Sequence, residues 1–97
     1  MIRVSTVYKT ASGVVTTKPA GLVSMQIGMD GTNDPTITIY NGTDNSGVEV
    51  VPTNTYDASL LGLSGFEGAT IKDCPNGIYL EITCAGDCEV ILGIIPI

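Results

Sequence analysis

Apolar and polar residues alternate over several short stretches of the chain, and this alternation predicts β-strands. Residues 23–27 alternate strictly, and residues 36–40 repeat the pattern. Further short strands are expected at 48–51, which Pro52 ends, and near 69–72. Turns rich in Gly, Asn and Asp separate these stretches. Strands at this spacing, divided by such turns, are typical of a sandwich or a small barrel.

No stretch of the chain favours a helix longer than one turn. Apolar residues nowhere recur at spacings of three and four over two turns, and Gly or Pro interrupts every long window. Residues 57–62 are compatible with a single helical turn. The sequence therefore predicts an all-β fold, an antiparallel β-sandwich or small barrel of the jelly-roll kind.

Residues 78–94 carry the strongest structural signal, which predicts that the chain ends in a β-hairpin. If Ala85-Gly86-Asp87 forms the loop, one face of the two strands is wholly apolar, and a slip of one residue would destroy this agreement. The facing pairs are Cys84 with Cys88, Ile82 with Val90, Leu80 with Leu92, and Ile78 with Ile94.

The chain is short and carries few charges. Its 97 residues are typical of one domain, and only 14% of them are Asp, Glu, Lys or Arg. About a quarter is usual for a soluble domain. A partner is therefore expected to cover part of the surface.

Composition also limits the partners and the compartment. The net charge of −6 argues against nucleic acid and anionic membranes, because both require clustered Lys and Arg. The longest apolar run, 90–97, is too short to span a bilayer. The first residues lack the pattern of a secretory signal, and three cysteines do not form a secreted disulfide framework. Synthesis in the cytoplasm is expected.

Charge divides the chain unevenly. The first 18 residues contain Arg3, Lys9 and Lys18 and no acid, whereas the remainder has one Lys against all ten acids. This division predicts an extended basic N-terminal arm at 1–18 and a single β-sandwich domain at 19–97. The arm is expected to dock on an acidic surface, its own or a neighbour's, and a frayed terminus is the alternative.

The last four residues, 94–97, contain no polar side chain. An exposed aliphatic strand end invites aggregation unless it is covered. We expect a second subunit to cover it, with the chain's own arm as the alternative. The predicted partner and oligomer interface comprises Arg3, Lys9, Lys18, Ile94, Ile95 and Ile97.

Candidate chemistry is sparse. The chain has no His, and therefore no ordinary triad or neutral-pH general base, and no Trp to wall a sugar cleft. Cys84 and Cys88 have only Cys74 to complete a zinc site that needs four ligands, so they are interpreted as small packed residues, close enough to oxidise. Residues 30–34 resemble a calcium loop but lack EF-hand spacing, and are interpreted as an Asx turn. We predict no catalytic residue, cofactor or metal.

From Val23 to Leu92 the chain resembles a loose group of short virion proteins of tailed bacteriophages. The shared features are a strand, a Gly-Thr-Asn-Asp turn, the segment Ile37-Thr38-Ile39-Tyr40-Asn41-Gly42-Thr43-Asp44-Asn45-Ser46-Gly47, Val50-Val51-Pro52, and a strand Gly77-Ile78-Tyr79-Leu80-Glu81-Ile82. The resemblance implies a structural, non-enzymatic protein of the virion, made in the host cytoplasm.

Within that class the first hypothesis is a capsid decoration (cement) protein. It would form a homo-oligomer, with a trimer at the lattice contacts as one arrangement, and bind the major capsid protein or another virion protein. A head-tail connector component is an alternative. The other alternative is a receptor- or carbohydrate-binding module of a tail or head fibre, which the five scattered aromatic residues disfavour.

Overall fold

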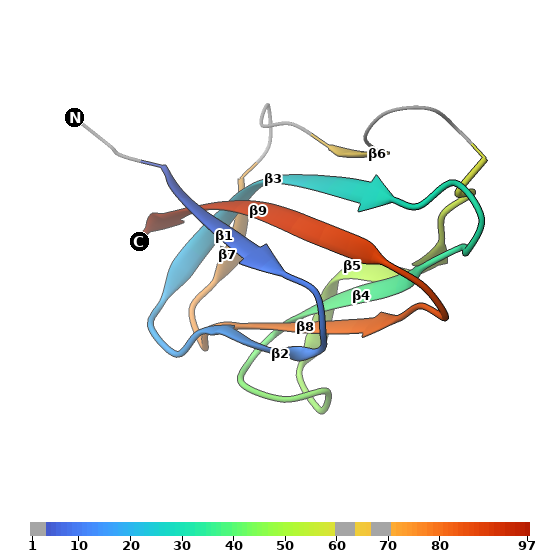
Figure 1. Cartoon of the computed structure of the whole chain (residues 1–97). Coiled ribbons are helices and arrows are strands. Elements are labelled where there is room, and N and C mark those ends of the chain that lie inside the picture. Colours follow the sequence, from blue (N-terminus) through green and yellow to red (C-terminus); the bar gives the residue numbers. More distant parts are fainter. Residues whose placement is uncertain (1–3, 60–63, 67–70) are drawn as a thin grey trace.

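The computed structural model describes residues 4–59, 64–66 and 71–97, the segment 64–66 by its backbone alone. Its strands form two antiparallel sheets that pack together around one core (Figure 1). The predicted all-β sandwich is confirmed.

Sheet A contains five strands, in the order β1 (Ser5–Lys9), β9 (Cys88–Pro96), β3 (Ala20–Met29) and β6 (Ser64–Phe66), with β7 (Lys72–Cys74) also on β3. β6 pairs with the second half of β3 and β7 with the first half, so the two short strands share one position. Sheet B contains β2 (Gly13–Thr16), β8 (Ile78–Thr83), β4 (Thr36–Asn41) and β5 (Val48–Thr55), in that order.

Aliphatic side chains from both sheets fill the space between them. Successive residues of a strand point to opposite faces, so each central strand contributes every second residue to the core. Each Val, Leu or Ile buried in this way contributes about 1.5–3 kcal/mol. The most deeply buried residues are Leu22, Met25, Ile27, Ile37, Ile39, Ile78, Leu80, Val90 and Leu92.

A β-bulge alters the predicted alternation in β3. Leu22 pairs with Ile94 and Ser24 pairs with Gly93, which leaves Val23 as the extra residue. The bulge lets Leu22 and Met25 both face the core although they are three residues apart. Val23, expected to face inward, is only half-buried.

Pro52 lies inside β5, where the sequence predicted that it ends the strand. β5 is an edge strand, and its register with β4 shifts between Ile37 and Ile39, next to Pro52. Edge strands and bulges are the places where a strand tolerates a residue without an N–H group. The predicted strand near 69–72 is found at Lys72–Cys74; residues 69 and 70 lie outside the described residues. Of the helical turn at 57–62, Ala58 and Ser59 form a turn and 60–62 lie outside the described residues.

The predicted C-terminal hairpin is wrong. β8 pairs with β2 and β4 in sheet B, whereas β9 pairs with β1 and β3 in sheet A. The loop 84–87 carries the chain across from one sheet to the other (Figure 1). The apolar residues of the two strands therefore meet across the core instead of side by side. Alternation alone fits both arrangements, because it identifies the apolar face and not the neighbouring strand.

The predicted N-terminal arm is also wrong from Ser5 onward. Residues 5–9 form β1 at the edge of sheet A, and residues 13–16 form β2 at the edge of sheet B. Val15 packs against the core cluster. These two short stretches have ordinary strand sequences, but their basic residues led to the prediction of an arm. Because β1 and β2 belong to the sheets, the sandwich begins before residue 19.

Candidate interaction surface

Exposed apolar side chains collect on the outer face of sheet A, the face turned away from sheet B. Tyr8 is 63% exposed, and its backbone pairs with Ile91 of β9. Val4, Ile71 and Ile97 are 50%, 45% and 55% exposed. We call this surface the outer apolar patch. It comprises Val4, Tyr8, Ile71, Ile91, Ile95 and Ile97.

Gly21 of β3 provides the floor of the patch. A Cβ atom at this position would lie 2.6 Å from Ile71 Cγ2, 3.1 Å from Ile95 Cγ1 and 3.3 Å from Ile97 Cγ2. The glycine therefore leaves the space in which three isoleucines from different parts of the chain lie against the sheet. Ile95 is buried beneath its neighbours, at 6% exposure.

Gly93 of β9 leaves the space in which the Val4 side chain lies against the sheet. A Cβ atom at Gly93 would lie 3.2 Å from Val4 Cγ1 and 2.5 Å from Ser24 Oγ. Gly93 and Ile95 are two residues apart on one strand, so they share a face. Val4 is thus continuous with the isoleucines over Gly21.

The structure brings together only part of the predicted interface. Lys18, Ile94 and Ile95 line a cavity of about 270 Å³ next to the end of β1 that begins at Ser5. Lys9 lies at the other end of β1 and donates a hydrogen bond from Nζ to the Val14 carbonyl oxygen, 3.5 Å away. Arg3 lies outside the described residues, and Ile97 belongs to the outer apolar patch.

Two apolar residues that were predicted to contact a second subunit instead pack within the chain. Ile94 is half-buried and packs against the core cluster, and Ile95 is buried. Neither offers a free apolar side chain to a partner. Val4, Tyr8 and Ile71 do offer exposed apolar side chains, and the sequence analysis did not identify them. Residues 4–8 are rich in β-branched and aromatic residues, a strand signal that could have identified the first two.

Sheet B also has exposed apolar side chains, Val14 at 39% and Val48 at 73%, but its outer face carries a group of polar and aromatic residues. The Tyr40 and Tyr79 rings lie 6.2 Å apart at 51°. The Tyr40 hydroxyl donates a hydrogen bond to Glu81 Oε1 (3.4 Å), and Asn45 Nδ2 donates to Glu81 Oε2 (3.2 Å). Desolvation, followed by the negative charges of Glu81 and Glu49, raises the pKa of Tyr40.

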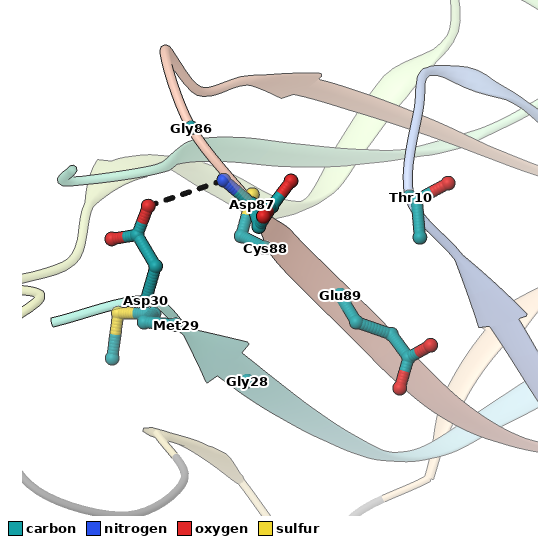
Figure 2. A pocket seen from close by; sticks show the side chains of 8 residues that line it. All are labelled: Thr10, Gly28, Met29, Asp30, Gly86, Asp87, Cys88 and Glu89. Carbon is teal, nitrogen blue, oxygen red and sulfur yellow. Dashed lines mark hydrogen bonds between the residues drawn. The ribbon is translucent and has the colours of Figure 1, made fainter. Parts of the chain in front are cut away.

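An open cavity of about 650 Å³ lies where the β3–β4 and β8–β9 loops meet (Figure 2). Asp30 organises one wall: its Oδ1 accepts hydrogen bonds from the N–H groups of Thr32 and Asn33, both at 2.8 Å. Its Oδ2 accepts from Asn33 Nδ2 at 2.8 Å and from the Asp87 N–H at 3.1 Å. These bonds, the one from the Asn33 N–H above all, hold the pKa of Asp30 well below its usual range.

This hydrogen bonding identifies the segment from Asp30 as an Asx turn that also holds the β8–β9 loop. Both carboxylate oxygens already accept N–H donors, and this arrangement leaves them poorly placed to bind a cation. Among residues 4–59 and 71–97, no three His, Cys, Asp or Glu side chains are grouped closely enough to hold a metal ion.

Comparisons with protein-family profiles, curated proteins and solved structures found no significant match. Within the described part of the chain there is no helix of the length and apolar character needed to cross a membrane.

Proposed function

We propose that the chain is a non-enzymatic structural protein of a virus particle, a decoration (cement) protein that works as a homo-oligomer on the capsid. The observation that carries the proposal is the outer apolar patch. Large exposed apolar patches are uncommon on monomeric proteins and mark surfaces that bind other proteins. On this chain Tyr8, Ile91 and Ile95 lie on strands of sheet A, and the other three members of the patch flank its strands.

The connectivity of the strands supports this proposal. If β6 and β7 are counted as one strand, sheet A reads first, eighth, third, sixth, and sheet B reads second, seventh, fourth, fifth. We propose that this is a jelly roll. Jelly rolls build many viral capsid proteins, and lectin domains also use them. The low charge and the sequence resemblance to phage virion proteins point in the same direction.

Sedimentation velocity of the purified chain tests the use of the patch. Wild type should sediment as an oligomer, and Val4→Asp or Ile97→Asp should give folded monomers, because each places a carboxylate in an apolar contact. Thr83→Asp adds the same charge at an exposed position of sheet B and is the matched control. A wild-type chain that stays monomeric at every concentration would contradict the proposal.

Binding to particles tests the biological role. The wild-type chain should bind undecorated capsids of the virus that encodes it, and quantitative mass spectrometry should count hundreds of copies per particle. A few copies per particle would instead indicate a connector or a fibre component. No binding to capsids or virions would remove the proposal altogether.

One observation favours a second candidate, a carbohydrate-binding module. Tyr40 and Tyr79, expected to be scattered, lie side by side with Glu81 and Asn45 on the outer face of sheet B. Tyr40 is only 8% exposed, so the half-buried Tyr79 offers the more accessible ring, and an aromatic ring with carboxylate and amide groups at its edge suits a sugar. Glycan-array binding that Tyr79→Ala abolishes and Val4→Asp preserves would favour this candidate over decoration.

A further inference from the structure

Cys84 and Cys88 stand at the two ends of the loop that joins the sheets. Cys84 directly follows β8 and Cys88 is the first residue of β9. The Cys84 thiol lies 3.9 Å from the Asn33 carbonyl oxygen, and the Cys88 backbone pairs with Met29. Both cysteines therefore lie beside the turn that begins at Asp30, four residues apart in the chain.

We propose that Cys84 and Cys88 are a site of reversible oxidation, and that the product is an intramolecular disulfide that ties the β8–β9 loop at its base. This proposal does not depend on the function proposed above. Both cysteines are free thiols in the structure.

The loop is held in a conformation that suits ring closure. Gly86 packs so closely on the Asp30 and Asn33 side chains that a Cβ atom would overlap them. The Asp87 N–H is bonded to Asp30. Closing the disulfide therefore orders little additional chain. The remaining thiol does not compete, because Cys74 pairs with Ala20 at the opposite end of β3 from Met29.

The oxidant is a small-molecule disulfide. The thiolate of Cys84, the less buried of the pair, attacks one sulfur of the reagent, whose S–S bond breaks and releases one thiolate. The thiolate of Cys88 then attacks the Cys84 sulfur of this mixed disulfide and releases the second thiolate. The protein loses two protons and two electrons, and the reagent leaves as two thiols.

Burial and charge set the rate of these steps. Burial, with the hydrogen bond to Cys84, raises the pKa of Cys88 to about 12, so ring closure is slow at neutral pH. Asp30, Asp87 and Glu89 line the cavity beside Cys88. A cationic disulfide such as cystamine should therefore react faster than an anionic one such as dithiodiglycolate. Salt should reduce this difference, because it screens the carboxylates.

The test treats folded, reduced protein with cystamine, followed by alkylation of the remaining thiols and intact-mass measurement. We expect one remaining thiol, a mass lower by two hydrogen atoms, no retained cysteamine, and a Tm higher by about 5–15 °C. Cys74→Ala should keep this Tm shift. Cys84→Ser and Cys88→Ser should each lose it.

Several results would overturn the inference. They are three alkylated thiols after treatment of the folded chain, disulfide-linked dimers as the only oxidised product, or a Tm that falls on oxidation. Faster reaction of the anionic reagent at low salt would contradict the role given to the carboxylates. The Tm shift is also measured in Val4→Asp, so that failure of oxidation and failure of oligomerisation are separated.

Discussion

Single residues at the centre of the core decide whether the sandwich forms. Val90 is fully buried between the sheets, whereas Ile82, near the end of β8, is only half-buried. A hairpin would have placed these two residues side by side with similar burial. In the sandwich the two residues differ in burial, and this difference can be measured through the stability of variants at each position.

We predict that Val90→Asp abolishes folding and that Ile82→Asp leaves a weakened but folded chain. An unpaired carboxylate at Val90 costs several kcal/mol, against a total stability of about 5–15 kcal/mol. Thermal unfolding followed by circular dichroism measures both variants, with Thr83→Asp as the exposed control. An equal loss of thermal stability in the two core variants would argue against the difference in burial between Val90 and Ile82.

The close approach of two loops gives a second prediction. Gly86→Ala places a methyl group against Asp30 and Asn33 and should cost about 1–3 kcal/mol in unfolding free energy, the range for overpacking. Gly28→Ala is the matched control, since its nearest contact would be the Glu89 carbonyl oxygen at 3.9 Å. Denaturant unfolding compares the two. Similar midpoints for both variants would show that the loops separate easily.

Asp30 makes stability depend on pH. Its pKa in the folded chain is lowered by its N–H donors, whereas an unfolded Asp titrates at about 3.9. Its contribution is therefore complete above pH 4 and is lost as the pH falls below that value toward the folded pKa. Asp30→Asn should lower the Tm at pH 7 and flatten its decline in acid. Thermal unfolding of wild type and Asp30→Asn, from neutral pH into acid, measures both effects.

At the scale of elements, the sequence predicted which residues face inward better than it predicted which strands are neighbours. Alternation correctly located β4 and most of β3. It failed at Val23, where a bulge shifts the period, and at Pro52, which an edge strand tolerates. It also could not choose between a hairpin and a crossing for β8 and β9. That choice depends on long-range pairing and on the fit of Gly86 against Asp30.

The residues predicted to form an interface coincide only in part with the outer apolar patch, for a similar reason. Of the apolar run 94–97, Ile95 and Ile97 belong to that patch. The exposed surface there also needs Val4 and Ile71, which are far apart in the sequence and meet over glycines. No local pattern identifies such a surface, because tertiary pairing creates it.

Strand pairing reverses the expectation for the N-terminal segment. Deletion of residues 1–12 would leave a folded domain if they formed an arm, but it removes β1 from the edge of sheet A. We predict loss of cooperative unfolding, because β9 then lacks a neighbour along one side. Deletion of 1–3 alone keeps β1 whole and is the control. A melting curve shared by wild type and the longer deletion would restore the arm interpretation.

For the whole molecule, the outer apolar patch predicts how assembly responds to salt. Apolar contacts persist when the Debye length falls from about 10 Å at 0.1 M to about 3 Å at 1 M, whereas contacts between exposed charges weaken. The proposed homo-oligomer should therefore keep its sedimentation coefficient across this range. Dissociation at high salt would indicate that charges such as Lys18 hold the subunits together.

The position of β9 governs how the chain can fold. β9 is the last strand of the sandwich to leave the ribosome, yet it lies between β1 and β3 at the centre of sheet A. Until it arrives, those two strands have no common neighbour, and the core lacks Val90 and Leu92. Pairing of residues as distant as Ser5 and Ile94 is also slow, on a scale of milliseconds to seconds. The complete sandwich therefore forms only after β9 has been synthesised and has paired with β1 and β3.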